Sequence, residues 1–327
     1  PWTYNSKSQA EILLLNPGLR DFPARWDASF DSVRGATRIL SELKQQFDVG
    51  DDRVDLNQYK VVILPDDVTL DESMLAKVQE YRKNGGAVIC SGYGGFNKDK
   101  SEFVLDPQSV IYEGPEPFDP IFFRPESEVA QDIPDLPIAV YSQGAAVNAG
   151  SGAKTLARLL KPYTNVRMWD GYHEHLYNPP EKDTGRPAVI QNGNLVYISF
   201  PIFSGYYRDA VISQKILVRN ILMHLLPDPM LEIEGLPSFG QATVAKSAAG
   251  ETLVHLLCYV PESRGNSQAI EESILMRDVT VKLRKNGCSI SNACLAPSGE
   301  KLQIQEDDGY VCVTVPEVDG YQLIVFS

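Results

Sequence analysis

The sequence predicts a parallel α/β domain of the doubly wound type, followed by a small all-β antiparallel sandwich. The first prediction rests on apolar runs that alternate with helix-like segments over the first hundred residues. The second rests on short alternating runs between glycine turns in the last third of the chain. Pro227 and Pro229 separate the two patterns. The predicted organisation is therefore a linker at 1–10, an α/β domain at 11–228 and a β-sandwich at 229–327.

The first domain is predicted from a β-α-β-α-β order of segments. Apolar runs without polar interruption suit parallel strands that are buried on both faces. Apolar residues at helical spacing mark the segments between these runs. In chain order, the predicted elements are a strand at 11–16, a helix at 32–47, a strand at 60–65, a helix that begins at Asp71, and a strand at 87–90.

A glycine-rich turn follows the last of these strands. Gly85 and Gly86 end the preceding helix, because glycine adopts the left-handed conformation without strain. Gly92, Gly94 and Gly95 come directly after the strand and allow a sharp turn. Open α/β sheets bind their ligands at the carboxyl edge of the strands. This turn is therefore the first place to look for chemistry, although we expect it to be architectural.

The middle of the chain is less regular, and seven prolines fall within residues 97–137. A loop of this length is usually functional or part of an interface. In chain order, we expect a short hairpin at 118–124, a short helix at 151–161, a hairpin of 188–190 with 195–200, and one long helix at 209–226.

The sandwich is predicted from seven short segments of alternating polarity. Their turns carry glycine, as in Asn286-Gly287 and Asp319-Gly320. The predicted strands are 231–234, 241–246, 252–259, 279–284, 301–305, 310–315 and 321–326.

Composition limits the classes of partner. The chain carries 43 acidic and 30 basic residues, for a formal net charge of −13. Nucleic acid requires a basic face, so neither nucleic acid nor an anionic membrane is expected, and no apolar run is long enough to span a membrane. Five cysteines are an odd number, which favours free thiols in a reducing compartment, the cytoplasm. The polar first ten residues are interpreted as a linker from a missing upstream domain.

Cys90 is the first candidate for chemistry. The run Ile89-Cys90-Ser91-Gly92 after a buried strand resembles the nucleophile elbow of class I glutamine amidotransferases. A cysteine nucleophile needs a base, usually histidine, to form its thiolate. In that family the histidine follows a late strand, and here Pro201 stands at the matching position. We therefore expect no catalytic residue in this chain. Cys90 is expected to be a packed, inert thiol with the ordinary pKa of about 8.5.

The second candidate is the segment around His173-Glu174-His175. Histidines two positions apart on a strand face the same side and could share a metal, but no third ligand lies nearby in the sequence. Trp169 and Tyr172 add aromatic faces, which suit a neutral sugar together with histidine donors. The five residues are predicted to form a substrate-edge loop without a metal or cofactor. A surface loop with hydrogen-bonded histidines is the alternative.

The order of the segments supports a family resemblance. The segments EILLLN, DLNQYKVVILPDDVTLDE, LAKVQEYRKNGGAVICSG and GNLVYISFPIFSGYYRD resemble the trimerisation domain of family 42 beta-galactosidases and the related family 151 alpha-L-fucosidases. The tail, with HLLCYVPESRG and MRDVTVKLR, is similar to the β-domain that ends such proteins. The resemblance implies a flavodoxin-like, class I glutamine amidotransferase-like domain that has lost the amidotransferase triad.

The resemblance also implies a function. The catalytic (β/α)8 barrel of those glycoside hydrolases precedes this region, so both catalytic carboxylates would lie outside this chain. The expected role is the assembly of a homo-oligomer, for which the family implies a trimer, and the loop at 169–180 would wall a neighbour's active site. Two alternatives stay open: a hydrolase that uses Cys90, and a carbohydrate-binding or other interaction module that acts through the sandwich or the His173 loop.

Overall fold

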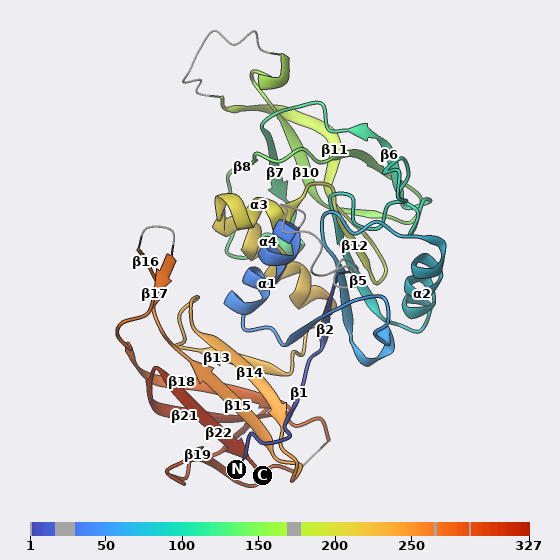
Figure 1. Cartoon of the computed structure of the whole chain (residues 1–327). Helices are drawn as coiled ribbons and strands as arrows, with labels where there is room; N and C mark the ends of the chain where they lie inside the picture. Colours follow the sequence, from blue (N-terminus) through green and yellow to red (C-terminus); the bar gives the residue numbers. More distant parts are fainter. Residues whose placement is uncertain (1, 17–29, 169–177, 265–266, 288) are drawn as a thin grey trace. The chain divides into compact units, whose positions relative to one another are not determined.

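The computed structural model describes residues 2–16, 30–168, 178–264, 267–287 and 289–327 (Figure 1). The chain folds into two compact units. The smaller unit consists of Pro1–Ile12, Leu40–Asp48 and Asp228–Ser327. The larger unit consists of Leu13–Ile39 and Val49–Pro227.

The larger unit is built on a nine-stranded mixed sheet (Figure 1). In spatial order its strands are β3 (Phe47–Gly50), β2 (Ile12–Leu15), β4 (Val61–Leu64), β5 (Ala87–Ser91), β12 (Leu195–Ile198), β11 (Pro180–Asn192), β10 (Lys154–Pro162), β7 (Ile121–Pro125) and β8 (Ile138–Val140). β4, β5 and β12 pair in parallel. From β12 to β8, each strand pairs antiparallel with the next.

The prediction of a flavodoxin-like, doubly wound parallel domain was wrong. A doubly wound fold has a mostly parallel sheet with helices on both faces, whereas this sheet continues for four antiparallel strands beyond β12. The described chain contains 22 strands and only four α-helices. The helices are α1 (Asp31–Glu42), α2 (Glu72–Lys83), α3 (Ile202–Asp209) and α4 (Ile212–Leu225). The segment between β5 and β12 supplies strands where a doubly wound fold would place crossover helices, so the molecule is mostly β.

Three other predicted elements also differ from the structure. The helix expected at 151–161 is strand β10, which pairs with β11 on one side and β7 on the other. Its alanine, leucine, arginine and lysine favour helix, but tertiary pairing overrides that local preference. The hairpin expected at 118–124 is absent, because β7 pairs instead with β10 and β8. The helix expected at 209–226 begins only at Ile212, because Ala210 takes a left-handed conformation that ends α3.

Helix α2 is formed as the sequence predicts. Three of its side chains are buried in the core, namely Met74, Val78 and Tyr81. Asp71 caps the helix by accepting a hydrogen bond of 2.9 Å from the backbone N–H of Met74. The same core contains Phe96, Phe103 and Tyr197, and the Phe103 ring centroid lies 4.8 Å from that of Tyr197 and 5.5 Å from that of Phe96.

The smaller unit consists of two antiparallel sheets that share an apolar core. One sheet has the order β1 (Lys7–Ser8), β14 (Gln241–Lys246), β15 (Thr252–Leu257), β22 (Tyr321–Phe326) and β19 (Ala293–Ala296). The other has the order β13 (Leu231–Glu234), β18 (Leu275–Arg284), β21 (Tyr310–Asp319) and β20 (Gln305–Asp307). The shorter pairs are β16 (Glu262–Arg264) with β17 (Ser267–Ala269) and, in the larger unit, β6 (Val110–Pro115) with β9 (Ala145–Ala149).

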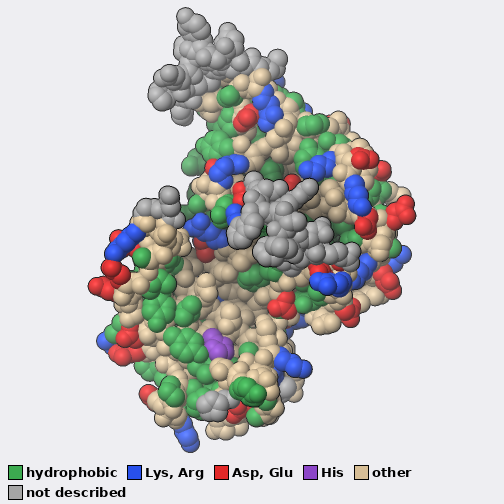
Figure 2. Space-filling view, in the orientation of Figure 1, with side chains coloured by type: hydrophobic (Ala, Val, Ile, Leu, Met, Phe, Trp, Pro, Cys, Tyr) green, Lys and Arg blue, Asp and Glu red, His purple; other side chains and the backbone are tan. Residues whose placement is uncertain are grey.

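The outward face of the five-stranded sheet carries no charged side chain on β14, β15, β22 or β19. Trp2 packs on one part of this face, against the cluster of Ala245, Leu253, Ala296, Leu323 and Val325. On another part, His255 Nδ1 lies 2.8 Å from the Tyr321 hydroxyl. In Figure 2, hydrophobic and uncharged side chains gather over this part of the smaller unit. Outward faces of antiparallel sheets are commonly polar, and the polar residues of this face, such as Thr243, His255 and Tyr321, are uncharged.

Candidate functional site

The glycine-rich turn after β5 packs closely against the ends of two neighbouring strands. A Cβ atom on Gly94 would lie 2.3 Å from the Leu64 carbonyl oxygen, and Gly92 has a positive φ of 54°. The Tyr197 hydroxyl donates a hydrogen bond of 2.7 Å to the Gly92 carbonyl. The Tyr93 N–H donates one of 2.7 Å to the Asp66 carbonyl. The turn is thus closed against β4 and β12 by backbone contacts and by Tyr197.

Asp66 is the buried carboxylate of this edge, and it is only 1% exposed. Its Oδ1 accepts a hydrogen bond of 2.6 Å from the Ser91 hydroxyl and a longer one of 3.3 Å from the Phe203 N–H. Its Oδ2 accepts two hydrogen bonds of 2.7 Å from the backbone N–H and hydroxyl of Ser204. Burial raises the pKa of Asp66, and the bonds from Ser91 and Ser204 oppose that rise.

The role of this carboxylate is to cap helix α3. The helix begins after Pro201, whose side chain offers no hydrogen bond to the first turn. The N–H groups of Phe203 and Ser204 belong to that turn and would otherwise lack partners. Asp66 supplies the acceptor from the end of β4, and its negative charge would also interact favourably with the helix dipole.

Cys90 lies in the apolar core beneath the turn and is 0% exposed. Burial raises the pKa of its thiol, and the positive charge of Arg82 opposes this only in part. The Sγ atom packs beside Gly95, within the same core cluster as Phe103 and Tyr197. A neutral thiol in such surroundings is a poor nucleophile. The inertness of Cys90 stays a prediction, and Pro201 occupies the N-cap of α3.

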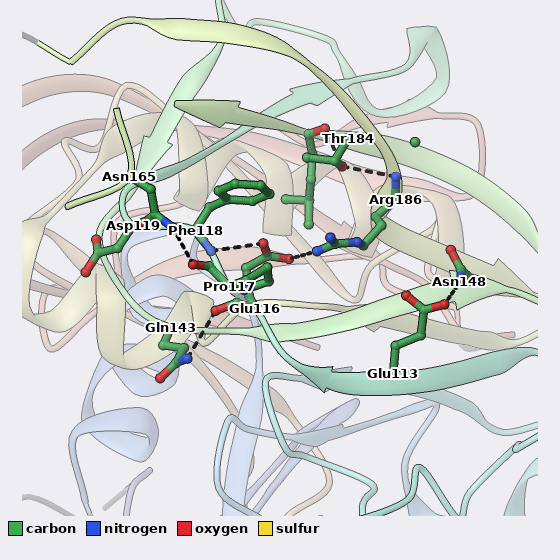
Figure 3. A network of polar contacts seen from close by, with 12 residues as sticks. Glu113, Glu116, Pro117, Phe118, Asp119, Gln143, Asn148, Asn165, Thr184 and Arg186 are labelled. Atoms are coloured by element: carbon green, nitrogen blue, oxygen red, sulfur yellow. Dashed lines mark hydrogen bonds and ion pairs between the residues drawn. The ribbon is translucent and has the colours of Figure 1, made fainter. Parts of the chain in front are cut away.

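A second buried charge lies in the proline-rich segment (Figure 3). The Glu116 side chain is 2% exposed and pairs with Arg186, with 2.7 Å between Oε2 and Nη1. The Phe118 N–H donates to Glu116 Oε1 over 3.3 Å, and Arg186 Nη1 donates to Oε2. Burial raises the pKa of Glu116, and Arg186 opposes this rise. The pair fixes the chain between β6 and β7 against β11.

The Glu116 network continues to the segment at 163–168. Asn165 donates a hydrogen bond of 2.8 Å to the Pro117 carbonyl and accepts one of 3.1 Å from the Asp119 N–H (Figure 3). Asn178 exchanges hydrogen bonds with the backbone of Thr164. These contacts fix the two described ends of the segment that includes the predicted substrate-edge residues.

The predicted substrate-edge residues themselves lie outside the described part of the chain. They are Trp169, Tyr172, His173, Glu174 and His175, within the gap at 169–177. Among the described residues, no group of three or more His, Cys, Asp or Glu side chains could hold a metal ion. None of the described helices is long and apolar enough to cross a membrane.

The sequence reasoning overlooked two of the buried carboxylates, Asp66 and Glu116. Asp66 had a usable signal, because it follows the predicted strand at 60–65 and so lies at the carboxyl edge of the sheet. Glu116 had no such signal in the sequence. Its partner Arg186 lies 70 positions away, and the antiparallel pairing that brings the two residues together was not predicted.

Comparison with known proteins identifies the family. The model of the beta-galactosidase trimerisation domain matches residues 38–224, more than half of the 327 residues. The chain belongs to the beta-galactosidase trimerisation domain family. The match confirms the resemblance noted in the sequence. A comparison with curated proteins found no match.

Several of the solved structures that are similar to this chain are glycoside hydrolases. Alpha-L-fucosidase isoenzyme 2 from Paenibacillus thiaminolyticus is 28% identical, with a TM-score of 0.88, over 99% of this chain and 49% of that chain. A beta-galactosidase from Bacillus circulans sp. alkalophilus is 14% identical, with a TM-score of 0.60, over 99% of this chain and 42% of that chain. A beta-galactosidase from Rahnella sp. R3 is also 14% identical, with a TM-score of 0.60, over 98% of this chain and 41% of that chain. The beta-galactosidases show the fold alone.

The chain spans about half the length of the fucosidase and about two fifths of the beta-galactosidases. The comparisons do not support the predicted amidotransferase-like description. The structure gives the physical reason, because the edge that would carry a nucleophile is filled by Asp66 and by the packed glycine turn.

Proposed function

We propose that this chain is a non-catalytic part of a glycoside hydrolase and that it holds the subunits together as a trimer. The observation that carries the proposal is the match of residues 38–224 to the beta-galactosidase trimerisation domain. The likeness of nearly the whole chain to about half of an alpha-L-fucosidase supports it. In this proposal the catalytic barrel and its two carboxylates lie outside these 327 residues, and the barrel is the second partner besides the chain itself.

The closed carboxyl edge of the sheet supports a non-catalytic role. Asp66 is committed to four hydrogen bonds that cap α3 and hold Ser91. The thiol of Cys90 is buried, and its raised pKa keeps it protonated near neutral pH. A hydrolase centred on Cys90 would need both a base and access for a substrate, and nothing in this geometry favours it.

The substrate class in this proposal is an α-L-fucoside or a β-D-galactoside. The fucosidase is 28% identical and the beta-galactosidases 14%, which favours the fucoside. We further propose that Trp169, Tyr172, His173, Glu174 and His175 wall the sugar site of a neighbouring subunit. The support is the set of hydrogen bonds made by Asn165 and Asn178, which fix the residues on either side of that segment. Free cysteines at positions 90, 258, 294 and 312 suit a reducing compartment such as the cytoplasm.

Two measurements on the purified 327-residue chain test the proposal. Sedimentation equilibrium is expected to give the mass of three copies. A panel of aryl glycosides that includes a β-galactoside and an α-L-fucoside is expected to show no turnover. A monomer at all accessible concentrations would contradict the assembly role. Turnover that is lost on substituting one residue of this chain would mean that the active site is built here.

A second candidate function, a carbohydrate-binding module, is favoured by the uncharged outward face of the five-stranded sheet. Tyr321 is 44% exposed on this face and is hydrogen-bonded to His255. An aromatic ring in uncharged surroundings suits a neutral sugar. Calorimetric titration with galactose, fucose and their oligosaccharides would detect such binding. Binding that is abolished by Tyr321→Ala would establish this function, and no binding at millimolar sugar would exclude it.

A further inference from the structure

A cavity of about 160 Å³ lies at one end of the smaller unit and is lined by both of its sheets. Its apolar wall consists of side chains that belong to the core of the sandwich or pack against that core. They are Met230, Val244, Leu283, Ile290 and Phe326. Protein cores are close-packed, and a hollow with an apolar wall and a few polar groups is the usual form of a small-molecule site.

One of the polar groups is a lysine on the inner face of a sheet. Ala242 and Val244 of β14 belong to the apolar core, so every second side chain of this strand faces inward. Lys246 is the next member of that series and lines the cavity. Inner faces of sandwiches form the apolar core, and lysine is rarely enclosed without a partner. Lys246 therefore departs from the pattern of its own strand at the cavity.

Two other basic residues line the cavity, and both are already paired. Arg284 forms an ion pair with Glu11, and Lys285 Nζ lies 2.8 Å from the Glu306 carboxylate. Ser327 also lines the cavity, and two backbone N–H groups donate hydrogen bonds of 2.9 Å to its backbone oxygen. No aspartate or glutamate is among the described residues of the lining. A charged ligand would therefore depend on Lys246.

The ammonium of Lys246 has only neutral partners in the described part of the chain. Its Nζ donates a hydrogen bond of 2.8 Å to the Thr252 hydroxyl and one of 3.3 Å to the Gly250 carbonyl. An ammonium carries three donors, so one donor remains for a ligand. Lys7 stands directly opposite Lys246 in the pairing of β1 with β14, and opposite residues share a face of the sheet. Two like charges side by side attract an anion.

We propose that this cavity binds a small organic carboxylate whose apolar body is the size of one ring. A cavity of about 150 Å³ with an apolar lining takes one benzene ring. The ring packs against Leu283, Ile290 and Phe326, and the carboxylate accepts a hydrogen bond from Lys246. Every residue that carries this inference lies outside residues 38–224. The inference therefore does not rest on the proposed function and goes beyond it.

Benzoate and benzamide are the probes, because they share a shape and differ in charge. The purified 327-residue chain is titrated with each at constant ionic strength, and binding is followed by ligand-detected NMR. Benzoate should bind with a Kd on the order of 1 mM, as is typical of a ligand with few atoms. Benzamide should bind about tenfold more weakly, because charge-assisted hydrogen bonds are the stronger ones. No binding of benzoate, or equal binding of the two probes, would overturn the proposal.

Lys246→Met removes the ammonium and keeps the apolar stem of the side chain. Its affinity for benzoate should fall about tenfold, to that of benzamide, and its affinity for benzamide should be unchanged. Lys301→Met is the matched control, because it removes the same charge from an exposed residue of the same unit that does not line the cavity. Its affinity for benzoate should equal that of the wild type. A preference for benzoate that survives Lys246→Met would show that the carboxylate binds elsewhere.

Ile290→Trp tests the apolar wall independently of the charge. Ile290 is partly buried at the cavity, and the larger side chain would occupy the space of the ring. Both probes should lose binding, while thermal unfolding stays cooperative. Binding of both probes at wild-type affinity to this variant would exclude the cavity as the site. Neither result bears on the proposed trimer, which sedimentation equilibrium tests separately.

Discussion

At the scale of single residues, Asp66 shows how this domain uses the edge of its sheet. The carboxylate lies where open α/β sheets place ligands. Here it accepts hydrogen bonds from Ser91, Phe203 and Ser204. The carboxylate therefore binds the first turn of helix α3 in place of a ligand. A buried carboxylate held in this way is a titrating group that contributes to stability, and its contribution depends on pH.

Asp66→Asn should become more stable relative to the wild type as pH rises. Burial raises the pKa of Asp66 above its ordinary value of 3.8, so the folded protein binds this proton more tightly than the unfolded chain. Its contribution to the free energy of unfolding is therefore complete below about pH 4 and is lost as pH rises through the raised pKa. Asparagine resembles the protonated carboxyl and does not titrate. Urea unfolding at a series of pH values from about 4 to about 8 measures the difference.

Asp66→Ala is the control for the hydrogen bonds themselves. It removes all acceptors from the start of α3, and it should lower the free energy of unfolding by about 2 kcal/mol or more at every pH. A wild type that gains stability over Asp66→Asn with rising pH would show that the hydrogen bonds and the helix dipole outweigh burial.

Cys90 should react more slowly with alkylating agents than a free thiol does. It is 0% exposed, and burial raises its pKa, so the thiolate is scarce at neutral pH. Peptide-resolved mass spectrometry after iodoacetamide treatment should show at least about tenfold slower labelling in the folded chain than in urea. The half-buried Cys294 serves as an internal reference. Faster labelling of Cys90 than of a model thiol would revive the hydrolase alternative.

At the scale of elements, the sequence predicted those that local pattern decides. The apolar runs of β2, β4 and β5 and the capped helix α2 were all predicted close to their bounds. The failures occur where distant pairing decides. β10 has a helix-favouring composition and becomes a strand because β7 and β11 are available on both sides. Ala210 carries no glycine-like signal, yet its left-handed conformation separates α3 from α4.

The glycine turn after β5 predicts a contrast between two glycine-to-alanine variants. Gly94→Ala would place Cβ 2.3 Å from the Leu64 carbonyl oxygen, and neither backbone can move without breaking the pairing of β4. We expect a loss of about 3 kcal/mol or failure to fold. Gly205 lies in α3, and a Cβ atom there would make only ordinary contacts of 3.5 Å with Gln214 and Ser142. Gly205→Ala should therefore raise the free energy of unfolding by about 0.5–1 kcal/mol. Thermal unfolding should show a lower Tm for Gly94→Ala and a higher Tm for Gly205→Ala. Similar decreases in the Tm of both variants would mean that the turn is not closed.

The Glu116–Arg186 pair predicts a coupling between two elements. Arg186→Met would leave the nearly fully buried Glu116 carboxylate without its partner, and we expect a loss on the order of 2 kcal/mol. This expected loss is smaller than for a fully buried pair, because Arg186 is 21% exposed and water can partly take its place. Glu116→Gln in the Arg186→Met background should recover part of the loss, because no charge then stays buried. Independent, additive effects in this double-mutant cycle would show that the pair is not coupled.

At the scale of the whole molecule, the family was predictable and the architecture was not. The family could be recognised from the order of local segments such as KVVILP and GGAVICSG. The mixed sheet could not be predicted in this way, because its antiparallel half depends on pairing between segments that are far apart in the sequence, such as Phe122 with Leu160. The residues proposed to touch sugar lie outside the described chain, so their role stays a prediction.

The proposed assembly into a trimer links the stability of the whole molecule to its concentration. Three folded copies bind each other and unfolded chains do not, so mass action raises the apparent Tm as the protein concentration rises. The wild-type chain should therefore show a Tm that increases over a hundredfold range of protein concentration. Scanning calorimetry measures this increase. A Tm that does not change with concentration, in a chain that sediments as a trimer, would mean that the subunits unfold without separating.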